Sequence, residues 1–126
     1  MSRSIGAFWI AALAVATGAA AQSAHPYVGT WHAAYENANG KSRQGTVVIT
    51  EAGGTWDMDV SSRGNPCQGR AVPITIRKAT ADELVFSIDR SAALPGCKDG
   101  TASLKRIDAT TLDGEFDRFK MKMTRK

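Results

Sequence analysis

The heptapeptide Thr55-Trp56-Asp57-Met58-Asp59-Val60-Ser61 alternates between polar and apolar side chains without a break. Successive side chains of a β-strand point to opposite faces, so its three apolar residues share one face and its polar residues share the other. The segment is therefore predicted to be a strand that buries Trp56 and exposes its aspartates to solvent.

The same alternation continues on both sides of this segment, and no stretch shows a convincing helical period of 3.6 residues. Turn-forming residues separate about eight short strands, and a single helical turn is the most that Arg90–Leu94 offers. The predicted strands are Tyr27–Tyr35, Gln44–Glu51, Thr55–Ser61, Ala71–Lys78, Glu83–Asp89, Thr101–Asp108, Thr111–Phe116 and Phe119–Arg125. Leu104 and Ile107 lie three positions apart within one of them, which predicts a β-bulge there.

The strands follow one another without a crossover helix, which predicts an antiparallel, up-and-down meander. Each strand has one apolar face, and closing the sheet into a small barrel buries all these faces and removes the exposed edges. The length of 126 residues is typical of one domain. We therefore expect residues 22–126 to form a single all-β barrel domain.

The first 21 residues have the three parts of a secretory signal peptide. Arg3 supplies the positive charge, Ala7 to Ala16 form an uninterrupted apolar run, and Ala19-Ala20-Ala21 provides the small residues for cleavage before Gln22. The apolar run is shorter than the roughly 20 residues that cross a bilayer. We expect a periplasmic or secreted protein with no membrane span.

Cys67 and Cys97 are the two cysteines of the chain. In a small exported domain such a pair is typical of a disulfide. Both lie in turn-rich segments, so the bridge should join two long loops and stabilise the fold by about 3–4 kcal/mol in the chain-entropy model. The spacing is not that of a redox motif, and two histidines are too few to complete a metal site.

Composition and motifs exclude several classes of function. The chain carries 16 Lys and Arg against 12 Asp and Glu, with the signs mixed along its length, which argues against a nucleic-acid-binding protein. The sequence contains no phosphate-binding loop, dinucleotide fingerprint or nucleophile–base arrangement. We therefore expect neither an enzyme nor a cofactor.

The triplet Gly29-Thr30-Trp31 in the first predicted strand resembles the Gly-x-Trp that opens lipocalin-like (calycin-type) barrels, and it is similar to the first strand of avidin-type barrels. In those families the tryptophan closes one end of the barrel, and an arginine from the last strand packs across its ring. The resemblance implies that Trp31 pairs with Arg125, or alternatively with Arg118. A cation over an indole ring contributes about 0.5–2 kcal/mol.

Three polar groupings are candidate sites, and each has a simpler interpretation. His25 and His32 are the only histidines, and His32 alternates with Trp31, so it is predicted to face solvent. Asp57 and Asp59 point the same way, as metal ligands or an acid–base pair would, but a half-buried strand needs such an outward face anyway. The cations of the last strand could attract a polyanion or an acidic protein, yet charged edges also prevent aggregation. These cations are Arg118, Lys120, Lys122, Arg125 and Lys126.

Two hypotheses for function follow. In the first, a non-enzymatic, monomeric barrel binds a small apolar or amphipathic ligand at its mouth through inward aromatic and methionine side chains, which alternatively only fill the core. These residues are Trp56, Met58, Phe86, Phe119, Met121 and Met123.

In the second hypothesis, the chain is an interaction module such as a periplasmic protease inhibitor or an envelope accessory factor. Its layout resembles that of small secreted inhibitors of bacterial metalloproteases, which implies that Gln22–Pro26 would be the segment that enters the protease. A packed interior would exclude the first hypothesis and leave the second.

Overall fold

The computed structural model describes residues 25–59 and 66–126. The elements are β1 (Gly29–Glu36), β2 (Ser42–Ile49), β3 (Gly53–Met58), β4 (Val72–Ala79), β5 (Glu83–Ile88), α1 (Arg90–Ala93), β6 (Gly100–Asp108), β7 (Thr111–Phe116) and β8 (Phe119–Arg125). Strands β7 and β8 have the predicted bounds. The predicted signal peptide (residues 1–21) and Val60 lie outside the described residues.

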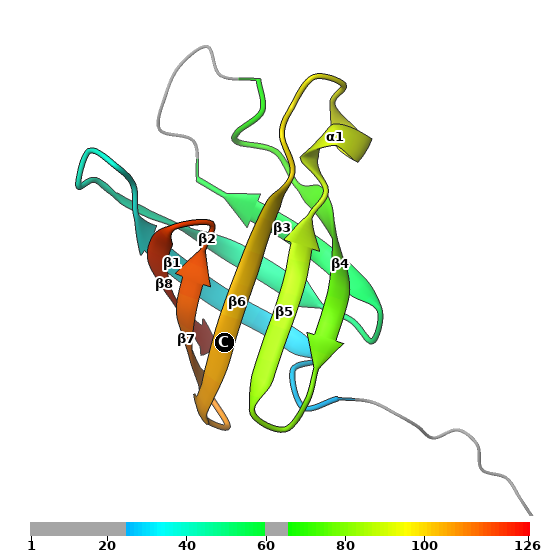
Figure 1. Cartoon of the computed structure of the whole chain (residues 1–126), viewed down its shortest axis with the longest axis vertical. Helices are drawn as coiled ribbons and strands as arrows, with labels where there is room; N and C mark the ends of the chain where they lie inside the picture. Colours follow the sequence, from blue (N-terminus) through cyan, green and yellow to red (C-terminus); the bar gives the residue numbers. More distant parts are fainter. Residues whose placement is uncertain (1–24, 60–65) are drawn as a thin grey trace, which may run out of the picture.

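The eight strands form one closed barrel (Figure 1). Each strand pairs antiparallel with the next in the sequence, and β8 returns to pair with β1, where Trp31 lies opposite Arg125. The predicted up-and-down meander is therefore confirmed, and closure leaves no unpaired edge. Within the described residues, no helix is long and apolar enough to cross a membrane.

Of every two successive side chains in a strand, one points into the barrel, as predicted. The inward rows of the eight strands meet in one hydrophobic cluster, in which Leu84, Phe86, Ile88 and Met123 have no exposed surface at all. No water-sized space therefore remains beside these side chains, and this middle part of the barrel is packed.

The bulge predicted in β6 is confirmed. The pairing with β7 shifts between Arg106 and Asp108, so Ile107 is the extra residue. Its side chain is 61% exposed, whereas Leu104 is buried. Ile107 therefore faces solvent, on the side opposite to Leu104. A second bulge, not predicted, lies between Ile76 and Lys78 in β4.

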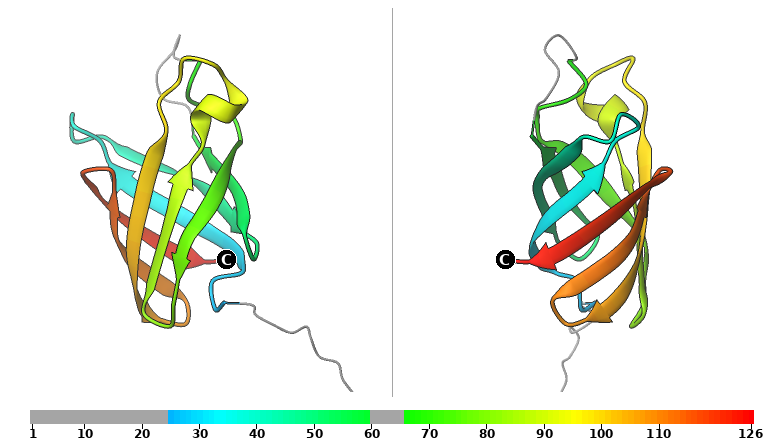
Figure 2. Two further views of the ribbon diagram at one scale, coloured as in Figure 1. Left: turned by 45° about the vertical axis from the view of Figure 1, so that its right-hand side comes forward. Right: turned by 90° about the vertical axis from the view of Figure 1, so that its left-hand side faces the viewer.

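The two ends of the barrel differ (Figures 1 and 2). At one end, here called the turn end, short connections join β2 to β3, β4 to β5 and β6 to β7, and the N-terminal segment crosses beside them. The other, the loop end, carries the long connections from β3 to β4 and from β5 to β6, the latter with α1.

Arg125 closes the turn end. Its guanidinium lies over the ring of Trp31, with the carbon 4.3 Å from the ring centroid. It also donates hydrogen bonds to the carbonyl oxygens of Pro26 (2.7 Å), Val28 (2.8 Å) and Ala109 (3.2 Å). One side chain of the last strand therefore holds the N-terminal segment and the β6–β7 turn together. Of the two arginines considered for this place, Arg118 lies at the opposite end.

The glycine of the Gly-x-Trp triplet makes room for this contact. Gly29 has a φ of 143°, a conformation that favours glycine, and a Cβ atom there would lie 2.7 Å from Nη1 of Arg125. The indole of Trp31 in turn donates its Nε1 hydrogen to the carbonyl of Tyr27 at 2.9 Å. The glycine and the tryptophan of the triplet thus form the site against which Arg125 packs.

The disulfide joins the long loops at the loop end, as predicted. Cys67 follows β3 and Cys97 precedes β6, and their Cα atoms are 5.6 Å apart. The bridge closes a loop with a sequence separation of 30 residues, so it restricts the unfolded chain considerably.

We predict that Arg125→Lys lowers the free energy of unfolding by about 2 kcal/mol, because a lysine cannot stack on the indole and bond three carbonyls at once. Urea denaturation measures the loss. Arg77→Lys, at an exposed position of β4, serves as the control and should change stability little. Equal losses in the two variants would contradict the proposed role of Arg125.

We also predict that the free energy of unfolding of the double variant Cys67→Ala/Cys97→Ala is about 3–4 kcal/mol lower than that of the oxidised protein. Reduction of the natural protein should give the same loss, which separates the effect of the bridge from that of the substitutions. Denaturation with and without a reductant measures both. If the reduced natural protein were as stable as the oxidised one, the bridge would contribute nothing.

Candidate functional site

A cleft of about 500 Å³ opens at the loop end of the barrel. Its walls come from β1, β2, the β7–β8 turn and the two loops that the disulfide joins. This volume is within the range of sites that hold small ligands. We call it the loop-end cleft. It is lined by Tyr35, Asn37, Ala38, Asn39, Arg43, Cys67, Gln68, Arg90, Gly96, Cys97, Lys98, Phe116, Asp117 and Phe119.

The apolar part of the loop-end cleft is an aromatic cluster. Phe116 lies at its centre, with ring centroids 4.9 Å from Tyr35 in an edge-on contact and 6.4 Å from Phe119. Tyr35 and Phe119 stack on each other at 6.0 Å, and both are only half-buried. Trp56 supports Phe116 from below at 4.8 Å. The cluster is therefore a supported surface with two aromatic side chains open to the cleft.

Three cations border the cleft beside these rings: Arg43, Arg90 and Lys98. Arg43 is the Cα partner of Tyr35 across β1 and β2, and it continues the inward row of Gly45, Val47 and Ile49. Arg90 likewise follows the inward row of Leu84, Phe86 and Ile88, one step beyond the end of β5. Both arginines are half-buried because alternation points them toward the barrel axis at its end.

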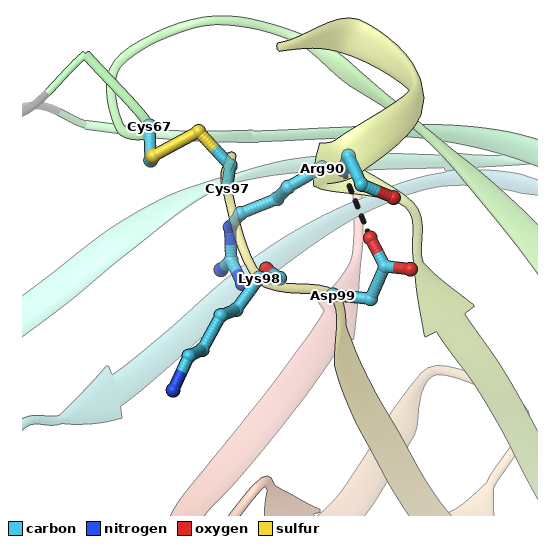
Figure 3. Close-up of a disulfide and its surroundings, with 6 residues drawn as sticks. Cys67, Arg90, Cys97, Lys98 and Asp99 are labelled. Atoms are coloured by element: carbon cyan, nitrogen blue, oxygen red, sulfur yellow. Dashed lines mark hydrogen bonds between the residues drawn. A yellow bond between two sulfur atoms is a disulfide. The ribbon is translucent and has the colours of Figure 1, made fainter. Parts of the chain in front are cut away.

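The β5–β6 loop holds Arg90 in place (Figure 3). Its Nη1 donates to the carbonyl of Lys98 at 3.3 Å, and its guanidinium carbon lies 5.5 Å from the centroid of Phe116. A Cβ atom on Gly100 would lie 3.2 Å from Nη1, so the absence of a side chain there leaves room for the arginine. The backbone N–H of Ser91 donates to Asp99 at 2.9 Å and fixes the start of α1.

One carboxylate lines the cleft, and it is engaged by the backbone. Asp117 occupies the β7–β8 turn with a φ of 54°, and its Oδ1 accepts the N–H of Thr101 at 3.0 Å. The lining thus has three cations against this single acid. Across residues 25–59 and 66–126, the one ion pair joins Lys78 to Glu83 in the β4–β5 hairpin, away from the cleft.

The six residues predicted to contact a ligand occupy three different places. Phe119 lines the loop-end cleft. Trp56 and Met58 border a cavity of only about 20 Å³ directly beneath it. Phe86, Met121 and Met123 are at most 1% exposed and belong to the packed core.

The histidines and the aspartate pair have local partners or face solvent. Nδ1 of His25 accepts the N–H of Tyr27, so its Nε2 carries the proton and donates to the carbonyl of Glu51 at 3.0 Å. His32 bonds Gln44 at 3.0 Å, and Asp57 and Asp59 are exposed. The described part of the chain has no group of three or more residues suited to hold a metal ion.

The cations of β8 do not form a continuous positive surface. Lys120 lies opposite Glu115 on β7, and Lys122 lies opposite Asp113. Arg125 is turned toward Trp31, and Lys126 donates to the hydroxyl of Thr46 at 2.9 Å. The register thus sets carboxylates of β7 beside Lys120 and Lys122, two of the charges that appear as an uninterrupted run in the sequence. In the predicted inhibitory segment Gln22–Pro26, the described residues 25–26 are held at the turn end, and the rest lie outside the described residues.

Comparison with known proteins leaves the site to be interpreted from its own geometry. No family model matches the chain, and no curated protein matches it. Among solved structures, a redesigned beta barrel is similar over 80% of this chain and 92% of its own, with 18% identity and a TM-score of 0.48.

Arg43, Arg90 and Lys98 were not among the residues predicted from the sequence. The phase of the alternation is the signal that would have found two of them, since Arg43 and Arg90 stand where the inward rows place an apolar residue. Lys98 had no such signal, because it lies in a loop and the disulfide brings it to the cleft.

Burial raises the pKa of Tyr35 above its ordinary value of 10.0, while the charges of Arg43 and Arg90 act in the opposite direction. The folded state therefore holds the phenol proton more tightly than the unfolded chain. This contribution to stability is complete below pH 10 and is lost as the pH rises through the raised pKa.

We predict that Tyr35, observed alone in a Tyr27→Phe variant, ionises above pH 10. Adding Arg43→Gln should raise its pKa further, because a cation that favours the phenolate is removed. Phenolate absorbance measures both titrations. Arg77→Gln is the control and should leave the titration unchanged; a fall in the pKa of Tyr35 on loss of Arg43 would contradict the geometry described.

Proposed function

We propose that the protein is an exported, non-enzymatic barrel that binds a small amphipathic ligand in the loop-end cleft. The observation that carries the proposal is the cleft itself: it is concave, and it places half-buried aromatic rings next to polar and charged side chains. Ligand sites typically combine an apolar surface with a few oriented polar groups in this way.

The packed middle of the barrel supports a ligand site at the end of the barrel rather than within it. The sequence alone does not distinguish the middle of the barrel from its ends, so it predicts that a packed interior excludes a ligand anywhere in the barrel. The structure divides that volume into a filled core below Trp56 and a cleft above Phe116. Packing therefore excludes a ligand enclosed among Phe86, Met121 and Met123 but is compatible with one on the aromatic cluster.

Strands and the disulfide support the walls of the cleft, which favours binding. Tyr35, Arg43 and Phe119 lie on strands, and the disulfide joins the two loops that form the opposite wall. A site that is ordered before it binds loses less conformational entropy when the ligand enters.

A calycin-type relationship and export are part of this proposal. Arg125 over Trp31 has the arrangement that the Gly-x-Trp resemblance implies, which supports the relationship. The disulfide is typical of proteins in oxidising compartments, which supports a periplasmic or secreted location.

The neutral fluorescent probe N-phenyl-1-naphthylamine tests the proposal. We expect saturable binding to the oxidised protein, and we expect Tyr35→Ala to weaken it about tenfold, because the loss of one aromatic contact costs about 1.4 kcal/mol. Fluorescence titration measures the dissociation constants, and thermal unfolding followed by circular dichroism checks that each variant is folded.

Ile107→Ala is the matched control, since it removes an exposed apolar side chain from β6 outside the cleft lining. Its affinity for the probe should equal that of the natural protein. A folded protein that binds no probe, or one that binds equally in the Tyr35→Ala variant, would refute a ligand site in the cleft and favour a protein-interaction module.

A further inference from the structure

The cations of the loop-end cleft have fewer hydrogen-bond partners than Arg125, the inward-pointing arginine at the turn end. Arg125 also stands at the end of an inward row, and its guanidinium is bonded to three carbonyl oxygens. In contrast, Arg43 makes no side-chain hydrogen bond or ion pair with any described residue, and neither does the ammonium of Lys98. Arg90 uses one donor, at 3.3 Å, for the carbonyl of Lys98.

Holding these like charges at one cleft carries a cost. Arg43 and Arg90 are half-buried, so solvent screens them less than it would at a fully exposed site. The nearest acid of the lining, Asp117, already accepts the N–H of Thr101. Most of the guanidinium donors of Arg43 and Arg90 remain available, five being the number that each arginine has.

Their placement beside the aromatic rings matches a specific ligand chemistry. Arg43 is the cross-strand partner of Tyr35, and Arg90 lies over Phe116. Both arginines also line the small cavity next to the cleft, so their donors border the apolar surface together. An acidic group can accept parallel hydrogen bonds from an arginine while an attached apolar body covers the rings.

We propose that the ligand of the loop-end cleft is an amphipathic anion, with its acidic group bound by Arg43 and Arg90 and its apolar body on Tyr35 and Phe119. The proposal rests on the proposed function and adds the chemical class of the ligand. Lys98, which is exposed at the rim, attracts the acidic group during entry.

A pair of probes that differ by one charge tests this inference. 8-Anilino-1-naphthalenesulfonate carries a sulfonate on the same ring system as the neutral N-phenyl-1-naphthylamine. We expect the natural protein to bind the sulfonate at least tenfold more tightly than the neutral probe, and added salt to reduce that preference. Arg43→Gln and Arg90→Gln should each lower the preference for the sulfonate over the neutral probe about tenfold.

Two further variants keep the test informative. Lys98→Gln changes an exposed side chain, so it should fold normally and lower the preference by a smaller factor, even if an arginine variant fails to fold. Arg77→Gln removes an exposed cation outside the cleft and should have no effect, which controls for nonspecific attraction of sulfonates.

The outcomes separate this inference from the proposed function. Equal binding of the two probes by the natural protein, or an equal loss of preference in the Arg77→Gln variant, would overturn the anionic ligand while leaving a ligand site in the cleft. Binding of neither probe would overturn the proposed function, and the inference with it.

Discussion

The contact between Arg125 and Trp31 is the interaction on which the barrel depends. Arg125 is the last residue of β8, and the segments that it bonds, at residues 26–28 and at Ala109, are separated by most of the chain. Pairing of β8 with β1 brings the two termini of the domain together, and this is the closure with the greatest loss of chain entropy. The guanidinium offsets that loss because it covers the indole and donates hydrogen bonds to carbonyl groups of the N-terminal segment and of the β6–β7 turn. Gly29 is required because its missing side chain is the space that the guanidinium occupies.

This closure makes the two ends of the molecule unequal. At the turn end, Tyr27 and Trp31 are 1% exposed, and short turns leave little for a ligand to contact. At the loop end, the disulfide joins the segments that connect β3 to β4 and β5 to β6. The aromatic layer of Trp56 and Phe116 seals the packed core from above, so the space between the loops is a separate compartment with its own chemistry.

Arginines at the ends of inward rows illustrate how position decides what a charge does. Arg125 meets carbonyl oxygens and becomes structural, whereas Arg43 and Arg90 meet aromatic rings and the rim of the loop-end cleft. On the outside of the barrel, Lys120 and Lys122 of β8 lie opposite carboxylates of β7. These two cations, which are prominent in the sequence, thus lie beside carboxylates of the neighbouring strand, whereas Arg43 and Arg90, which are inconspicuous in it, line the cleft.

The sequence by itself determined the strands, their order and the identity of the core, because alternation records which side of a pleated strand is buried. It also determined the disulfide, since two cysteines allow one pairing. The Gly-x-Trp resemblance predicted Arg125 as the partner of Trp31 with Arg118 as the alternative, and the structure decided for Arg125. The irregular spacing of Leu104 and Ile107 indicated the bulge in β6, whereas nothing in the alternation indicated the one in β4. Only the tertiary structure decided where the candidate site lies. Whether an inward residue fills the core or lines an opening depends on its height along the barrel axis. That height is set by the register between neighbouring strands and by the closure of β8 on β1.

Phe86 and Phe119 look alike in their alternating strands, yet register places the first in the core and the second at the cleft. Register brings Arg43 and Arg90 to one cleft for the same reason, since no local pattern encodes contacts between segments so far apart in the chain. The disulfide-linked β5–β6 loop adds Lys98.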